Sequence, residues 1–163
     1  MSEDKKSVID RIKVAADNGD ADSQYILATF YEYVRPCTTD VRENEKEVFK
    51  YYKLAADNGV AEAQGKMGDI YFFDNIYYRI THRNFKKAFE YYKLAADNGD
   101  AYAQCRVACF YECGLRDYDI QKGGHIIVVP ENKVKALEYY ELAANNGDTR
   151  AKEKVNQLRL KRK

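Results

Sequence analysis

Apolar residues recur at helical spacing in segments of the chain that end in nearly the same pentapeptide. Ala-Ala-Asp-Asn-Gly stands at 15–19, 55–59 and 95–99, and Ala-Ala-Asn-Asn-Gly stands at 143–147. Before the third copy, the stripe of Ala88, Tyr91 or Tyr92, and Ala95 follows the 3.6-residue period of an amphipathic helix. Asn-Gly is typical of a helix end, because glycine readily adopts the left-handed conformation. The recurrence predicts a stack of similar helical units.

We call the helix that ends in the pentapeptide helix B, and a second helix, helix A, is predicted after it. Helix A has the pattern Ala-x-x-Gln-x-x-apolar-small-x-x-Tyr, and its copies begin at Ala21, Ala61 and Ala101. Asp20 and Asp100 are placed to cap helix A, whereas Val60 has no capping oxygen in its side chain. The predicted caps of helix B lie eleven positions before each pentapeptide, at Asp4, Asn44, Asn84 and Asn132.

The pentapeptides begin at positions 15, 55, 95 and 143, so they are spaced by 40, 40 and then 48 residues. Since the distance from cap to pentapeptide does not change, the eight additional residues fall in the third A–B loop, about 114–131. The predicted fold is therefore all-α, an α/α solenoid of antiparallel helix pairs in a single domain over 1–163. Its expected parts are an N-terminal half-repeat helix at 4–18, repeats at 20–58, 60–98 and 100–146, and a C-terminal capping helix at 148–160.

Composition narrows the class of protein. With a net charge of +1, Lys and Arg provide no excess that would favour nucleic acid or an anionic membrane as a partner. Charged residues at 33% and hydrophobic residues at 45% are typical of a folded chain. No apolar run reaches the ~18 residues of a membrane span, and the first residues lack the apolar core of a secretory signal. We therefore expect a cytoplasmic protein with reduced cysteines.

Candidate catalytic and metal-binding residues are sparse. Cys105, Cys109 and Cys113 lie four apart on one predicted helix, which separates the first and third by about 12 Å, too far for one zinc ion or a disulfide. His125 in a loop could pair with Cys113 as an activated nucleophile, but no third group that would orient the imidazole is identifiable. The sequence therefore predicts no catalytic residues, no metal site and no cofactor, and a protein that is not an enzyme.

The segment His125-Ile-Ile-Val-Val-Pro130 has four β-branched residues outside the predicted helices. Such residues would be a costly exposed patch unless something covers them. Two interpretations stay open. The segment folds back onto the neighbouring helices, or it forms a strand that binds a partner or a second copy of the chain.

Tyrosine pairs stand at 51–52, 91–92 and 139–140, within the predicted B helices. Stacking on nucleic-acid bases would be one use of such residues. However, one member of each pair falls on the core stripe, and the other is expected to pack against the adjacent unit with its hydroxyl at the edge. We therefore assign the pairs to core packing.

The repeated unit resembles the Sel-one-like repeat family, which is related to the tetratricopeptide repeats. The residues that carry the resemblance are Ala61, Ala63, Met67, Gly68, Tyr71, Lys87, Ala88, Tyr91, Tyr92, Ala95, Ala96 and Gly99. The match extends over about 7–158, although Tyr replaces the family's Trp in each helix B and the Gly-x-Gly-Val turn is eroded. The resemblance implies a right-handed, tetratricopeptide-like superhelix that serves as a protein–protein interaction scaffold.

The resemblance also implies that the A helices line a concave binding face. The expected partner-binding residues are Tyr25, Thr29, Tyr33, Asp69, Phe72, Phe73, Tyr102 and Cys109, with Ile126, Ile127 and Val128 of the third loop as further candidates. This face is acidic and aromatic and is expected to lack Lys and Arg, so we predict a basic or apolar protein segment as the partner. The alternative is a structural solenoid without a separate ligand, and we expect a monomer or weak self-association.

Overall fold

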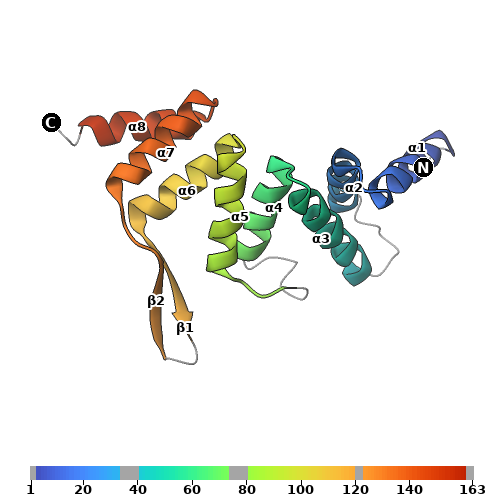
Figure 1. The fold of residues 1–163 in the computed structure, drawn as a ribbon, viewed down its shortest axis with the longest axis horizontal. Helices are drawn as coiled ribbons and strands as arrows, with labels where there is room; N and C mark the ends of the chain where they lie inside the picture. Colours follow the sequence, from blue (N-terminus) through green and yellow to red (C-terminus); the bar gives the residue numbers. More distant parts are fainter. Residues whose placement is uncertain (1–2, 34–40, 74–80, 120–122, 161–163) are drawn as a thin grey trace. The chain divides into compact units, whose positions relative to one another are not determined.

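A computed structural model describes residues 3–33, 41–73, 81–119 and 123–160, and these divide into two compact units. The N-terminal unit, 1–83, contains helices α1 (Glu3–Asp17), α2 (Ala21–Tyr33), α3 (Val41–Asp57) and α4 (Ala61–Phe72). The C-terminal unit, 84–163, contains α5 (Phe85–Asp97), α6 (Ala101–Cys113), strands β1 (Leu115–Asp119) and β2 (Gly124–Val129), α7 (Lys133–Asn145) and α8 (Thr149–Leu160) (Figure 1).

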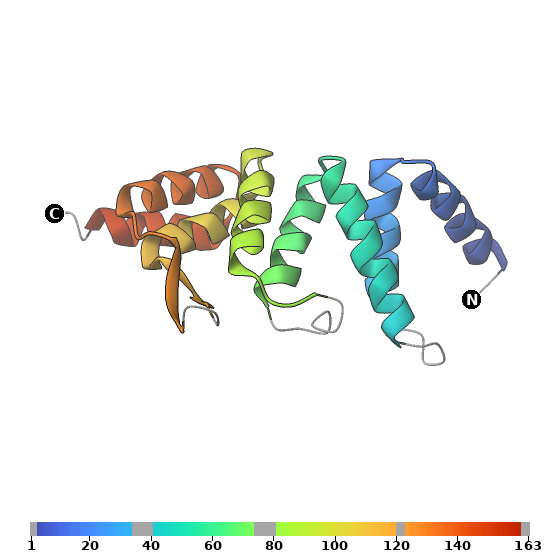
Figure 2. The ribbon, with the colours of Figure 1, turned by 60° about the horizontal axis from the view of Figure 1, so that its bottom comes forward.

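Within each unit, helices that follow one another along the chain pack side by side (Figures 1 and 2). In the N-terminal unit α2 packs between α1 and α3, and α4 packs on α3. In the C-terminal unit α6 packs on α5 and α7, and α8 packs on α7. The predicted α/α solenoid of helix pairs is confirmed. Among the described helices, none is long and apolar enough to cross a lipid bilayer.

The pentapeptide forms the same turn at each B–A junction. Gly19 has φ +96°, and its N–H donates to the Ala16 carbonyl at 3.1 Å. The N–H of Asp20 donates to the Ala15 carbonyl at 3.1 Å, which completes a Schellman motif. Only glycine adopts this φ without strain, and the two alanine carbonyls that would be left unpaired at the helix end are satisfied. The other three junctions repeat this pattern of bonds at Gly59, Gly99 and Gly147.

Buried glutamines tie each turn to its neighbours. Gln24 is 3% exposed, and its Nε2 donates to the Ala16 carbonyl at 3.0 Å, while its Oε1 accepts from Asn58 Nδ2 at 2.9 Å. In the C-terminal unit Gln104 and Asn146 form the same bond at 2.9 Å. The asparagine of the pentapeptide therefore joins one helix B to the helix A before it, because a buried amide must find hydrogen-bond partners.

The helix caps agree with the sequence at most positions. Asp20 accepts from the Ser23 N–H at 2.7 Å, and Asp148 likewise caps α8 by accepting from the Ala151 N–H at 2.8 Å. Val60 makes no side-chain cap bond, as expected. In helix B, Asn84 and Asn132 are confirmed as caps and accept from backbone N–H groups at 2.9 and 3.0 Å.

Two predicted caps of helix B are wrong. Asn44 lies inside α3, which begins at Val41, and Asp4 lies inside α1, which begins at Glu3. The amide of Asn44 instead donates to the carbonyl of Tyr31, in the last turn of α2, at 3.0 Å. A residue of a type that commonly caps helices can therefore lie within a helix, where its side chain bonds to another helix instead. The local sequence does not reveal such a contact.

The inserted part of the third A–B loop forms an antiparallel hairpin of β1 and β2, drawn below α6 in Figure 1. Strand pairing satisfies backbone groups that an irregular loop would leave to solvent. At the base of the hairpin, Leu115 and Val129 are 7% and 2% exposed, whereas Ile127 is 66% exposed. The segment therefore forms a strand whose base packs against the protein, while Ile127 in the same strand remains at the surface.

Candidate functional site

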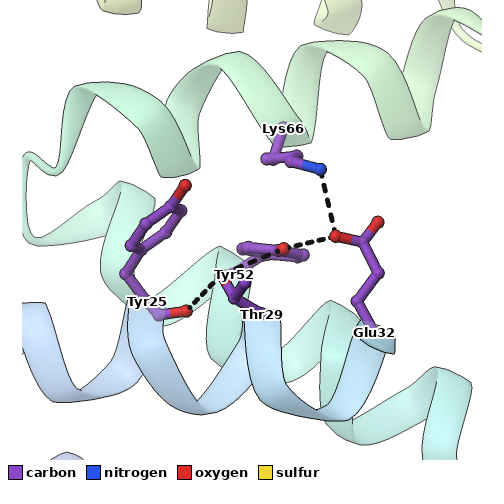
Figure 3. Close-up of polar contacts among 5 residues, drawn as sticks. All are labelled: Tyr25, Thr29, Glu32, Tyr52 and Lys66. Atoms are coloured by element: carbon purple, nitrogen blue, oxygen red, sulfur yellow. Dashed lines mark hydrogen bonds and ion pairs between the residues drawn. The ribbon is translucent and has the colours of Figure 1, made fainter. Parts of the chain in front are cut away.

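Four side chains from three helices meet in the N-terminal unit, and we name this set the first cluster: Thr29, Glu32, Tyr52 and Lys66. The hydroxyl of Tyr52 donates to Glu32 Oε2 at 2.7 Å, and Lys66 Nζ lies 3.0 Å from the same oxygen (Figure 3). Glu32 comes from α2, Tyr52 from α3 and Lys66 from α4. One carboxylate therefore joins three consecutive helices through two charge-assisted hydrogen bonds.

Thr29 contributes little to this cluster. Its hydroxyl donates to the carbonyl of Tyr25 at 2.9 Å, within α2. Its oxygen also lies 3.4 Å from the hydroxyl of Tyr52, but the single proton of each hydroxyl is already donated elsewhere. The contact between Thr29 and Tyr52 is therefore a weak one.

The C-terminal unit contains an equivalent arrangement, the second cluster: Cys109, Glu112, Tyr140 and Lys154. Tyr140 donates to Glu112 Oε2 at 2.6 Å, and Lys154 Nζ lies 3.1 Å from both carboxylate oxygens. These residues belong to α6, α7 and α8. Cys109 takes the place of Thr29, and its Sγ lies 3.1 Å from the Tyr140 hydroxyl.

Burial sets the protonation of the two tyrosines. Both side chains are fully buried, and this desolvation raises the pKa of Tyr52 and of Tyr140 well above the usual value. The neighbouring carboxylates, Glu32 and Glu112, raise them further. Each phenol is therefore protonated at neutral pH and can donate its hydrogen bond.

The thiols of α6 differ from one another. Cys105 is buried, Cys109 is half-buried and Cys113 is exposed. Hydrogen bonding from Cys105, helped by the Tyr140 hydroxyl and the positive charge of Arg106, lowers the pKa of Cys109. The same hydrogen bond, together with burial, raises the pKa of Cys105. Of the pair Cys105 and Cys109, the lower pKa therefore belongs to Cys109.

The structure places the predicted partner-binding residues in three different surroundings. Thr29 and Cys109 belong to the clusters, and Tyr25 lies beside the first, with its ring 5.9 Å from that of Tyr52. Tyr102 is half-buried, 6.3 Å from the ring of Tyr92. Tyr33 and Phe73 are 83% and 46% exposed, Asp69 and Phe72 are half-buried, Ile126 and Ile127 are exposed, and Val128 is half-buried.

The expectation that this surface lacks basic residues is wrong. Lys66 and Lys154 lie on it and pair with Glu32 and Glu112. A signal for them was present in the sequence, because Lys66, Arg106 and Lys154 occupy the same position in successive A helices. The two residues of each pair are 34 and 42 positions apart in the chain. A repeat pattern does not indicate such a contact unless both partners are compared between copies.

The remaining candidates for chemistry are described briefly. The imidazole of His125 packs edge-on against the ring of Tyr118, its cross-strand neighbour, at 5.4 Å. Among the described residues, no group of three or more His, Cys, Asp and Glu side chains could hold a metal ion. Cys37 lies outside the described residues.

The tyrosine pairs pack as expected. Tyr51 and Tyr52 are both fully buried, and Tyr51 donates its hydroxyl to Asp17 of the preceding pentapeptide at 2.8 Å. Tyr139 stacks on Tyr111 at 5.8 Å, while Tyr140 joins the second cluster. The prediction of core packing with hydroxyls at the edge is confirmed for these two pairs.

Helix pairs closed by a recurring Schellman turn define an α-helical repeat protein. The Sel1 repeat model matches residues 21–60, 61–100 and 101–148. These matches cover most of the 163 residues, and the chain belongs to the Sel1 repeat family. Proteins of this family are generally protein–protein interaction scaffolds. No match was found among curated proteins.

Solved structures with the same fold come from several bacteria. A Sel1 repeat protein from Oxalobacter formigenes is 27% identical with a TM-score of 0.70, over 90% of this chain and 96% of that one. The protective antigen c5321 of uropathogenic Escherichia coli is 22% identical with a TM-score of 0.68, and the match covers 94% of this chain and 29% of that one. Helicobacter pylori cysteine-rich protein B is 17% identical with a TM-score of 0.58, over 91% and 92% of the two chains.

Proposed function

We propose that this protein is a non-catalytic interaction scaffold that binds a partner protein through its A helices. The observation that carries the proposal is an exposed residue at one repeat position, the end of helix A. Tyr33 is 83% exposed and Phe73 is 46% exposed, and Cys113 at the equivalent position is also exposed. Aromatic residues at the surface contribute little to folding, but they are the commonest anchors of protein interfaces.

The charges near these residues support a basic and apolar partner segment. Asp22 and Glu62 are exposed carboxylates at equivalent positions in the first turns of α2 and α4. In the first cluster both donors use Oε2 of Glu32, so its Oε1 can accept from a ligand. Lys66 offsets part of the negative charge, so apolar anchors rather than charge alone would provide most of the affinity.

Peptide binding tests this proposal directly. Fluorescence anisotropy would compare two sets of extended peptides with equal apolar content, one rich in Lys and Arg and one rich in Asp and Glu. We expect micromolar binding of the basic set and at least a tenfold weaker affinity in the double variant Tyr33→Ser, Phe73→Ser, since an interface anchor contributes about 1.4 kcal/mol or more.

The matched control is Leu142→Ser, which removes a comparably exposed apolar side chain from a helix B. The control should bind the basic peptides as the unaltered protein does. Stronger binding of the acidic set, or an equal loss in the control, would contradict the assignment of the binding surface to the A helices.

A second candidate is self-association through the hairpin. In β1 and β2 the cross-strand pairs Arg116–Ile127 and Tyr118–His125 share one face. Tyr118 is 54% exposed and Ile127 is 66% exposed, which leaves an apolar patch without protein cover. Sedimentation over a range of concentrations would detect association, and Ile127→Lys should abolish it. A protein that stays monomeric at high concentration would exclude this alternative.

A cytoplasmic location is part of the proposal. The free thiols of Cys105, Cys109 and Cys113 fit a reducing compartment. Thiol labelling of the protein immediately after lysis of its host should find these cysteines reduced, and a stable mixed disulfide at any of them would argue for another compartment.

A further inference from the structure

We propose that the outer edge of strand β2 pairs antiparallel with β2 of a second copy of this chain, so that two hairpins form one four-stranded sheet. This proposal rests on the self-association through the hairpin described above. It assigns the contact to the backbone edge of β2 and not to the exposed side-chain face. The reason is a difference between the two edges of the hairpin.

The direction of the backbone groups identifies what each edge presents. Tyr118 lies opposite His125, but the N–H of Tyr118 donates to Asp117 Oδ1 at 2.8 Å. Opposed residues of an antiparallel pair either exchange both N–H···O bonds or exchange none, and the two types of pair alternate. The N–H and C=O of His125 therefore point to the outer edge of β2. The same holds two residues further along, where Ile127 lies opposite Arg116.

The edge of β1 is protected against strand addition. Its sequence Leu-Arg-Asp-Tyr-Asp has three charged residues, and charge is a common device for protecting a sheet edge. The Asp117 carboxylate already accepts the outward N–H of Tyr118, which a new strand would need. Helix α5 also lies beside β1. A strand arriving at this edge would therefore have to displace a hydrogen bond and desolvate charged groups.

The edge of β2 lacks these protections. Its sequence Gly-His-Ile-Ile-Val-Val has no Lys, Arg, Asp, Glu or Pro. Among the described residues, no further strand pairs with it. The register shift in the hairpin lies between Leu115 and Arg116, at the base, so β2 keeps regular pairing from Gly124 to Ile127. This regular part contains both residues whose backbone groups point outward, and the Ile127 side chain is 66% exposed.

The hairpin is anchored at its base. The N–H of Asn132 donates to the Tyr111 carbonyl at 2.7 Å, and Leu115 and Val129 are buried. An isolated two-stranded hairpin is at best marginally stable in water, and further strands stabilise it. The anchored base holds β2 as a strand before any partner binds, which lowers the entropic cost of adding another strand.

The β2 edge is suited to a second copy of itself. An antiparallel pair about a two-fold axis is self-complementary, and an axis at Ile126 brings the outward groups of His125 to those of Ile127 in the second copy. The two His125 side chains then lie opposite isoleucines, and no like charges are opposed. Each Ile127 would lie between Arg116 of its own hairpin and His125 of the second copy, which covers its exposed side chain.

Sedimentation velocity of the full chain under reducing conditions tests the pairing. We expect a weak monomer–dimer equilibrium with a Kd of about 100 µM, because the contact area is small. Ile127→Pro removes an outward N–H that the bonds between β1 and β2 do not use, and it should raise the Kd about tenfold or more. The matched control is Arg116→Pro, which removes the outward N–H of the opposite residue and should leave the Kd unchanged within about twofold.

The outcomes separate this pairing from other modes of self-association. A monomer at every concentration would overturn both the edge pairing and the self-association on which it rests. Equal effects of Ile127→Pro and Arg116→Pro would overturn the assignment to the β2 edge. Tyr118→Ser removes a side chain of the exposed face but no backbone donor. A dimer that this variant abolishes would form through that face, and the edge pairing alone would be overturned.

Disulfide cross-linking gives a second test, which does not depend on the folding of the proline variants. With the axis at Ile126, the two Ile126 side chains are opposed in a pair without backbone hydrogen bonds, where side chains lie closest. Under mild oxidation, Ile126→Cys should form a disulfide with the same position of the second copy, located by mass spectrometry. Tyr118→Cys, on the other strand, is the control and should form no such disulfide. The absence of a disulfide at position 126, or an equal yield in Tyr118→Cys, would overturn the proposal.

Discussion

The two clusters, one in each unit of the molecule, have equivalent Tyr, Glu and Lys residues in the same arrangement. In the first, Tyr52 and Lys66 lie 2.7 and 3.0 Å from the carboxylate of Glu32. In the second, the equivalent groups lie 2.6 and 3.1 Å from the carboxylate of Glu112. Since the distances agree within 0.1 Å, the two units share the Tyr–Glu–Lys contact, although the intervening repeat has Phe72 at the position of Glu32 and Glu112. The residue that differs between the two clusters is Thr29 in the first and Cys109 in the second.

The comparison also separates two kinds of polar residue. Glu32 and Glu112 are satisfied by partners from neighbouring helices, so their first role is to hold the stack together. Tyr33 and Phe73 are exposed at the ends of their helices, and their removal would alter the surface more than the fold. Acidic residues of a repeat surface therefore need to be checked for internal partners before they are assigned to a ligand.

The largest effect is expected from removal of the buried tyrosine in either cluster. Tyr52→Ala and Tyr140→Ala should each lower the free energy of unfolding by about 3–5 kcal/mol, because each leaves a cavity and a carboxylate without its donor. Urea denaturation followed by circular dichroism would measure both. Tyr33→Ala, at a position 83% exposed, is the control and should change stability by less than about 0.5 kcal/mol. Unequal losses for the two buried tyrosines would show that the clusters are not equivalent.

Removal of the carboxylate should have an intermediate effect. Glu32→Ala and Glu112→Ala leave a buried phenol proton and a lysine without their acceptor, at a cost of about 1–3 kcal/mol each. In a double-mutant cycle, Glu112→Ala with Tyr140→Phe should show a coupling energy, whereas Glu112→Ala with Tyr52→Phe should be additive. Additivity in both pairs would mean that the contact between Tyr140 and Glu112 contributes nothing to stability.

A missing cap distinguishes α4 from α6, the equivalent helix of the C-terminal unit. Val60 offers no side-chain acceptor, whereas Asp100 accepts from the N–H of Ala103. Val60→Asp should therefore stabilise the protein by about 1 kcal/mol, and Asp100→Ala should destabilise it by a similar amount. Thermal melting would measure both. A Tm that stays the same or falls with Val60→Asp would contradict the cap placement.

The smallest effect on stability is expected from exchange of the differing residues. Thr29→Cys and Cys109→Thr should each change the free energy of unfolding by about 1 kcal/mol or less, because the side chains are similar in size. Reactivity should change much more. Since the pKa of Cys109 is lowered, its thiolate is the dominant form above that pKa, and alkylation should slow as the pH falls through it.

The thiol introduced by Thr29→Cys is the matched control for the effect of the second cysteine. It has Tyr25 in place of Cys105 one turn earlier, so it lacks the hydrogen bond that favours ionisation. At pH 7 it should react more slowly than Cys109, as measured by timed alkylation. Equal rates would show that Cys105 has no part in the reactivity.

Local sequence was sufficient for the repeat and its turns. Gly19 forms the predicted turn, and Asp20 and Asn84 form the predicted cap bonds. These features are predictable because a left-handed glycine and a cap bond involve residues only a few positions apart. The start of α3 was not predicted, because Asn44 is a good cap that is instead held by Tyr31 of another helix. The exposed residues proposed as the binding surface follow from the resemblance to tetratricopeptide-like repeats, which places helix A on the binding face, and the peptide experiment tests their role.

The sequence by itself determined the helix pairs, their order and the Schellman turns, since these follow from spacing, small residues and glycine. Only the tertiary structure decided which polar groups meet. Lys66 reaches Glu32, and Lys154 reaches Glu112, because packing brings α4 to α2 and α8 to α6 through the helix between them. The thiol of Cys109 acquires its character in the same way. Its neighbours on α6 can be identified from the sequence, but Tyr140 and Lys154 come near it only when three helices pack together. Burial at this place strengthens the electrostatic interactions and hydrogen bonds of these groups.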